Sequence, residues 1–145
     1  MSVDIEVVQA ATGEIVQAFW RLLPQLSGSA APLDEPALRA LVAWPGVRLL
    51  VARVDGEIMG ALTLVMFPIP TGLRAWIEDV VVDEAARGQG AGAALTAEAV
   101  RLARADGART VDLTSRPSRQ AANRLYERLG FRLRDSRVYR LADGQ

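Results

Sequence analysis

A glycine-rich turn between a β-branched strand and an alanine-rich helix constrains the fold of this chain more than any other feature. The strand is predicted over residues 76–82, a short acidic connection follows, and glycines occupy positions 88, 90 and 92. Residues 90–105 have the small side chains and apolar spacing of a helix. Such a turn exposes unpaired amide groups and the positive end of a helix dipole where a backbone can approach a ligand closely. It therefore suits a phosphate or a pyrophosphate.

The remaining pattern predicts an α/β (α+β) fold with a mixed sheet. Asp55-Gly56 is a strong hairpin signal between two apolar strands, and strand–helix–strand order later in the chain favours a parallel pair. We expect about six to seven mostly antiparallel strands with helices on both faces. The strands are predicted over 3–8, 47–54, 57–67, 76–82, 110–113 and one or two within 131–141, and the helices over 12–26, 35–44, 90–105 and 118–129, with a loop at 27–36.

The composition removes several kinds of chemistry. The 145-residue chain has neither cysteine nor histidine, which excludes disulfides, thiolate metal sites, cysteine nucleophiles and Ser–His–Asp triads, and we expect no metal site. Its 17 basic residues balance its 17 acidic ones, which disfavours a nucleic-acid partner. No apolar run approaches the ~20 residues of a membrane span, and the first residues lack a signal-peptide pattern. We therefore expect one soluble, cytoplasmic domain over residues 1–145 without membrane contact.

Three interpretations of the glycine-rich turn compete on the residues alone. Gly88, Gly90 and Ala93 fit the G-x-G-x-x-[GA] fingerprint of dinucleotide-binding folds. That fingerprint should follow its strand directly, whereas residues 83–87 intervene here and antiparallel strands precede it. The phosphate loop of NTPases fails because the chain has no Gly-Lys-Ser/Thr at this place. The third interpretation is a tight strand–helix turn whose small residues serve packing only.

Two motifs together resemble a known family. Residues 87–92, RGQGAG, match the [RQ]-x-x-G-x-[GA] signature of the GNAT acyltransferase superfamily. Ala122, Leu125-Tyr126 and Gly130-Phe131 match its A-x-x-L-Y-x-x-x-G-F pattern at the expected separation. The resemblance rests on motifs from residue 47 onward and on element order before that. It implies a GNAT-like sheet that splays at the parallel pair.

The resemblance also implies a binding site for acetyl-CoA. Backbone amides of the glycine-rich turn would cradle the pyrophosphate, the preceding strand would pair with the pantetheine arm, and Tyr126 would stabilise or protonate the departing thiolate. Many members carry Asn seven residues before this tyrosine; here Arg119 stands there, and Asn123, one turn later, is a candidate substitute. The predicted cofactor-binding residues are Val80, Val81, Val82, Arg87, Gly88, Gln89, Gly90, Ala91, Gly92, Ala93, Arg119 and Asn123.

A catalytic base follows from the reaction's needs. An amine must be neutral to attack, yet a typical ammonium has a pKa near 10, so a group must accept its proton. Without histidine a carboxylate is the natural candidate. Glu78 shares strand parity with Val80 and Val82, and Asp79 points to the other face unless a bulge shifts the register. We predict Glu78 as the base. Pairing with an arginine or orienting the substrate ammonium remains open for Glu78, as does a packing role for Tyr126.

We therefore expect an N-acetyltransferase that moves acetyl from acetyl-CoA to a primary amine, by direct attack in a ternary complex. A small-molecule amine is favoured over a protein N-terminus or lysine. The resemblance implies that segments 26–38, 67–74 and 134–139 build the acceptor site, where Asp34 and Glu35 could attract a cation. The alternative from another class is a non-catalytic acetyl-CoA-binding sensor module. Homodimers are common in the family, but the sequence identifies no interface.

Overall fold

The computed structural model describes residues 2–29 and 31–143; Ala30, within the predicted loop 27–36, lies outside the described residues. The chain forms two compact units, which meet in sequence between Thr114 and Ser115. Among its described residues, 115–143, the second unit contains one helix, α4 (Gln120–Arg128). The first unit contains, in order, β1 (Val3–Val7), α1 (Gly13–Leu26), α2 (Glu35–Ala43), β2 (Val47–Val54), β3 (Glu57–Ile69), β4 (Gly72–Val82), the short 3-10 turn η1 (Glu84–Ala86), α3 (Ala91–Ala105) and β5 (Thr110–Leu113).

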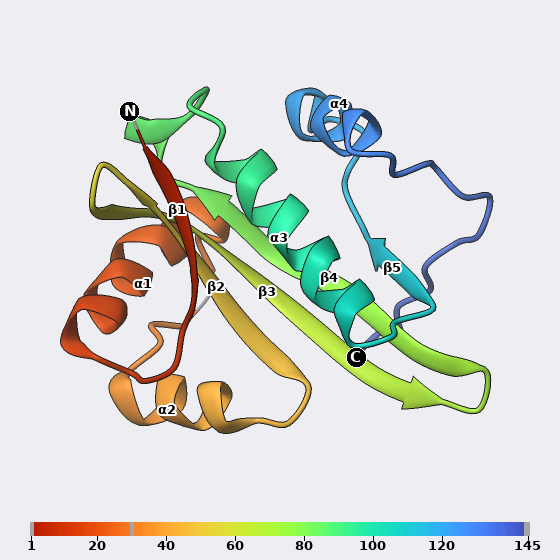
Figure 1. The fold of residues 1–145 in the computed structure, drawn as a ribbon, viewed down its shortest axis with the longest axis horizontal. Helices are drawn as coiled ribbons and strands as arrows, with labels where there is room; N and C mark the ends of the chain where they lie inside the picture. Colours follow the sequence, from red (N-terminus) through yellow and green to blue (C-terminus); the bar gives the residue numbers. More distant parts are fainter. Residues whose placement is uncertain (1, 30, 144–145) are drawn as a thin grey trace. The chain divides into compact units, whose positions relative to one another are not determined.

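The five strands of the first unit form one sheet in the order β1-β2-β3-β4-β5 (Figure 1). The first three junctions are antiparallel and the last, between β4 and β5, is parallel. The hairpin between β2 and β3 turns at Asp55 and Gly56, whose φ angles of 51° and 91° are those of a tight hairpin turn. The structure thus confirms the mixed sheet and its parallel pair.

The helices of this unit cover both faces of the sheet, as expected (Figure 1). On one face, four α1 residues join Leu38 of α2 and strand residues in a buried cluster, which includes Ile15, Ala18, Phe19, Leu22, Val51, Ala61 and Val81. On the other face lies α3. A Cβ added to Gly60 would come within 3.2 Å of Leu95 Cδ1 in α3, so glycine lets this helix approach β3 closely.

The starts of α1 and α2 follow the sequence signals. Thr12 precedes α1, and its hydroxyl accepts a hydrogen bond from the Ile15 amide at 3.3 Å, so Thr12 caps the helix. Asp34 caps α2 through a 2.9 Å bond from the Ala37 amide. Both helices therefore satisfy part of their free amide groups with local side chains.

Two predictions for the C-terminal unit are wrong. The sheet has five strands rather than six or seven, because residues 131–141 form no strand in the described chain. Alternating apolar residues suit a strand, but a strand exists only where its backbone groups pair with a neighbour. Here Leu133, Val138, Tyr139 and Leu141 are largely exposed instead. The helix also begins at Gln120 with Arg119 as its N-cap, not at Ser118.

The end of α4 does follow its signal. Gly130 comes directly after the C-cap residue Leu129 and has a φ of 99°, a conformation that glycine adopts without steric cost. Its amide donates to the Glu127 carbonyl at 3.0 Å, and the Phe131 amide donates to the Tyr126 carbonyl at 3.0 Å. Glycine therefore ends α4.

Within residues 2–29 and 31–143, none of the helices combines the length and the apolar character needed to span a bilayer.

Candidate functional site

A bulge interrupts β4 at its acidic pair. Ala61 of β3 lies opposite Val81, but Thr63 lies opposite Glu78, so β4 holds one extra residue there. Asp79 takes a φ of 50°, which few residues other than glycine adopt. The extra residue restarts the alternation of faces. Glu78 therefore shares the α1–α2 face with Val81, and the expectation that it shares a face with Val82 is wrong.

Parallel pairing between β4 and β5 stops before β4 ends. Pairing runs from Arg74 opposite Thr110 to Ile77 opposite Leu113, and β4 then continues for five residues to Val82. In the described chain, β5 offers no partner to residues 78–82. Where the two strands pair, an ion pair links them, because Arg74 Nη2 of β4 lies 3.0 Å from Asp112 Oδ2 of β5. The backbone edge of Val80, Val81 and Val82 is thus open on the β5 side, and such an edge can pair with an extended ligand.

A buried carboxylate anchors the connection after β4. Asp83 accepts a 2.9 Å hydrogen bond from the Ala85 amide and a 3.0 Å bond from Arg21 Nε of α1. Gln25 of the same helix accepts from the Glu84 amide at 3.0 Å. The Ala85 amide first, and then Arg21 and Gln25, hold the pKa of Asp83 below its ordinary value, so its carboxyl is charged at neutral pH. This anchor fixes where the glycine-rich turn begins.

This anchor was not predicted from the sequence. Asp83 follows a strand and precedes a tight turn, a place where a short acidic side chain often bonds to the next amides. That signal was present. Nothing local could have paired it with Arg21, which is 62 residues away along the chain.

The glycine-rich turn has two glycines with positive φ that border open space. Gly88 and Gly90 have φ angles of 81° and 88°, and a Cβ added to either would meet no atom within 4 Å. Gly90 caps α3 without any side-chain hydrogen bond from the described residues. The first amides of the helix, Ala91, Gly92 and Ala93, therefore face a space that an anion can enter. Arg87 is exposed beside them, 4.0 Å from Glu84 across a loose ion pair.

In the C-terminal unit, α4 carries a tyrosine whose hydroxyl keeps its proton. Tyr126 is buried, and its ring meets Phe131 edge to face with centroids 5.9 Å apart. Burial raises the pKa of this hydroxyl, and the positive charge of Arg119 opposes that effect only in part. The hydroxyl is therefore protonated at neutral pH. The Asn123 side chain is held by a 3.0 Å bond from its Nδ2 to the Arg116 carbonyl.

The structure thus places the predicted site residues in two groups. Glu78, Val80, Val81, Val82, Arg87 and the turn from Gly88 through Gln89 to Ala93 follow one another along β4 and into α3. Arg119, Asn123 and Tyr126 share α4 and its cap. Among the described residues, no group of three or more acidic side chains could hold a metal ion.

The comparison with known proteins agrees with this geometry. The model of the Acetyltransferase (GNAT) family matches residues 14–131, most of the chain. The chain therefore belongs to the Acetyltransferase (GNAT) family. No curated protein sequence matches it significantly.

Solved structures resemble the chain over almost its whole length. A proposed acetyltransferase from Agrobacterium tumefaciens str. C58 has a TM-score of 0.82 at 25% identity, covering 99% of this chain and 100% of that one. A Trypanosoma brucei acetyltransferase has a TM-score of 0.79 at 26% identity, with 97% and 99% covered. A Bacillus halodurans C-125 protein named as a transcriptional regulator has a TM-score of 0.77 at 29% identity, with 96% and 99% covered.

Proposed function

We propose that residues 1–145 form a single acetyltransferase domain, which moves the acetyl group of acetyl-CoA to the primary amine of a small molecule. The observation that carries the proposal is the continuity of an open β4 edge with an unobstructed cradle at the start of α3. An extended amide-containing arm ending in a pyrophosphate needs both features in that order. Membership of the GNAT family supports the same reaction class.

The residues present suit the donor. Backbone groups of Val80, Val81 and Val82 would pair with the pantetheine amides as an added strand does. The amides after Gly90 would receive the pyrophosphate, and Arg87 would add a full positive charge beside it. Open space in front of Gly88 and Gly90 is what allows the phosphate to come close to the backbone. Bound there, acetyl-CoA supplies a thioester that is already activated for acyl transfer.

Glu78 is the proposed base. It is exposed on the α1–α2 face, and none of the ion pairs formed by the described residues involves it. This argues against the alternative in which Glu78 serves only as an arginine's partner. Glu78 takes the proton of the acceptor ammonium, directly or through water, and frees the nitrogen lone pair.

Tyr126 is the proposed acid. The amine nitrogen bonds to the acetyl carbon, the carbon–sulfur bond breaks, and the electron pair goes to sulfur as a thiolate. Tyr126 donates its hydroxyl proton to that sulfur, while the nitrogen releases its second proton to water and the Tyr126 phenolate takes a proton back from water, so the products are an acetamide and free coenzyme A. The raised pKa of Tyr126 means that the hydroxyl carries its proton at neutral pH and has one to donate.

The second candidate is an acetyl-CoA-binding module that does not turn over. One observation favours it, namely that a structural relative at 29% identity is named as a transcriptional regulator. Binding and turnover must therefore be measured separately. Calorimetry with acetyl-CoA measures the first, and release of free thiol in the presence of amines measures the second.

The decisive variant is Gly90→Val, with Gly56→Val as its control. Both glycines have φ near 90°, and both face open space, so the substitutions strain the backbone alike. Only Gly90→Val blocks the cradle, and we expect at least about a tenfold loss of acetyl-CoA affinity, with Gly56→Val near wild type. Equal affinities in the two variants would refute the cradle. If wild type binds acetyl-CoA but releases no thiol with any amine, the sensor module replaces the enzyme.

A further inference from the structure

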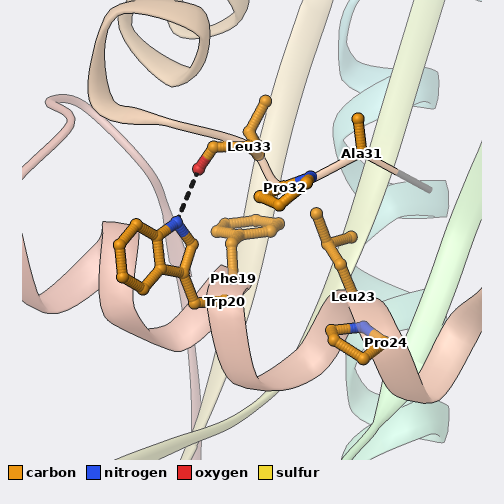
Figure 2. A pocket seen from close by; sticks show the side chains of 7 residues that line it. All are labelled: Phe19, Trp20, Leu23, Pro24, Ala31, Pro32 and Leu33. Carbon is orange, nitrogen blue, oxygen red and sulfur yellow. Dashed lines mark hydrogen bonds between the residues drawn. The ribbon is translucent and has the colours of Figure 1, made fainter. Parts of the chain in front are cut away.

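An apolar cavity of about 330 Å³ lies between α1 and the loop that leads to α2 (Figure 2). Its walls are Phe19, Trp20, Leu23 and Pro24 on the helix and residues 31–33 on the loop. In Figure 2, Pro32 lies across from the Phe19 ring, and the Trp20 indole closes one side. The volume is at the lower end of small-molecule sites, enough for an aryl or branched alkyl group.

The polar groups near this cavity are already occupied. The Trp20 indole N–H donates to the Leu33 carbonyl at 3.0 Å, which fixes the ring and removes its donor. The Asp34 carboxylate accepts the capping hydrogen bond at the start of α2. Glu35 binds Arg39 through both of its carboxylate oxygens. These are the two acids that the sequence offered for attracting a cation. With both occupied, the cavity wall selects for apolar surface rather than for charge.

The cavity and Glu78 lie on the same face of the sheet. Phe19, which forms part of the wall, belongs to the buried cluster that also contains Val81. The β4 bulge places Glu78 on the side of Val81. Arg21 and Gln25 contact the turn that follows β4. Leu23 lies on the opposite side of α1, so the cavity that it lines is on the side of the helix away from that turn.

We propose that this cavity holds the apolar side group of the acceptor, so that the preferred substrate is a primary amine carrying an aryl or branched alkyl group. The inference rests on the proposed function and names its substrate class. Amino sugars and polyamines, whose surfaces are polar or charged throughout, would gain nothing from these walls. Burying a phenyl-sized group accounts for at least about a tenfold preference.

The test uses the full-length protein, with 2-phenylethylamine as the apolar probe and glucosamine and spermidine as the polar ones. Ala31→Trp fills the cavity from its exposed loop side without touching the buried core. Trp44→Phe is the control, since Trp44 is an exposed tryptophan outside the cavity. Binding is followed by ligand-detected NMR, and turnover by release of free coenzyme A.

We expect kcat/KM for 2-phenylethylamine to exceed that for either polar amine by about tenfold or more, and Ala31→Trp to abolish this preference. The same variant should leave acetyl-CoA affinity and the weaker turnover of ethanolamine within about twofold of wild type. Trp44→Phe should change none of these values.

Two outcomes separate the two proposals. Turnover of a polar amine, without binding or acetylation of 2-phenylethylamine, overturns the substrate class and leaves the acetyltransferase intact. Binding of 2-phenylethylamine that Ala31→Trp removes, in a protein that acetylates no amine, confirms the apolar site and overturns the proposed function. Equal loss of all amines in Ala31→Trp also refutes the selective role of the cavity.

Discussion

Glu78 and Asp83 are five residues apart at the end of one strand, yet the fold uses them in opposite ways. Asp83 is buried, bonded to the Ala85 amide and to Arg21, and its pKa is lowered by those contacts. Glu78 is exposed, beside a bulge that contains a left-handed Asp79. The carboxylate that the fold has paired with Arg21 and a backbone amide serves structure, whereas the one that it leaves accessible is the candidate for chemistry. Each substitution below tests that division.

The largest effect is expected from Glu78→Gln. Loss of the base should lower kcat by on the order of 10³, because the acceptor ammonium then loses its proton only to water. Unfolding midpoints should stay near wild type, since the side chain is exposed. Asp79→Asn, at the neighbouring exposed acid, is the control and should retain most activity. Steady-state release of free thiol measures kcat of both variants. Full turnover in Glu78→Gln would show that Glu78 is not the base.

Tyr126→Phe should have the next largest effect. The ring and its contact with Phe131 persist, but the proton donor is lost, so we expect kcat to fall by on the order of 10² with little change in acetyl-CoA affinity. Single-turnover kinetics and calorimetry measure the two quantities. A fall in affinity with unchanged kcat would instead indicate that Tyr126 only shapes the binding surface.

Asp83→Asn, unlike Glu78→Gln, should act on the stability of the fold. It weakens the bonds to Ala85 and Arg21 in a buried setting, which should cost about 2 kcal/mol in the free energy of unfolding. Asp106→Asn is the matched control, because Asp106 also pairs with an arginine, Arg48, but at the surface, where loss costs under about 1 kcal/mol. Urea denaturation measures both. Equal costs would show that the Asp83 anchor contributes no more than a surface pair.

The smallest effect is a pH dependence of stability. Because the folded pKa of Asp83 is below the unfolded value, its contribution is present above about pH 4 and is lost as pH falls through the folded pKa. The stability difference between wild type and Asp83→Asn should therefore shrink on acidification below about pH 4. Denaturation at several pH values checks the sign. A difference that stays constant down to pH 2 would mean that Asp83 is not the titrating group.

The fold was largely predictable because its signals are local. Thr12 and Gly130 mark helix ends by bonds or angles within a few residues, and Asp55-Gly56 sets a hairpin through its own backbone. The prediction failed at residues 131–141, where alternation suggested a strand. A strand depends on a partner that may be distant, and alternation alone does not supply one.

The candidate site also contains features that local sequence predicts and features that depend on distant contacts. The glycine-rich turn from Gly88 to Ala93 could be predicted as a turn before a helix, because glycine spacing marks where the backbone turns and where the helix leaves its first amides without intrahelical partners. The side of the sheet that Glu78 faces could not, because one extra residue in β4 reverses the alternation and only pairing with β3 reveals it. The Arg21–Asp83 pair was equally inaccessible, since its members are far apart in sequence.

By itself, therefore, the sequence determined the order of elements, the parallel strand–helix–strand unit, the glycine cradle and the family signatures. These depend on short-range backbone preferences that residues express wherever they stand. The tertiary structure decided which acid is buried and which is exposed, where β4 and β5 separate, and that α1 and its loop enclose an apolar cavity. Those properties arise from contacts between distant segments, and a linear pattern does not record which segments will meet.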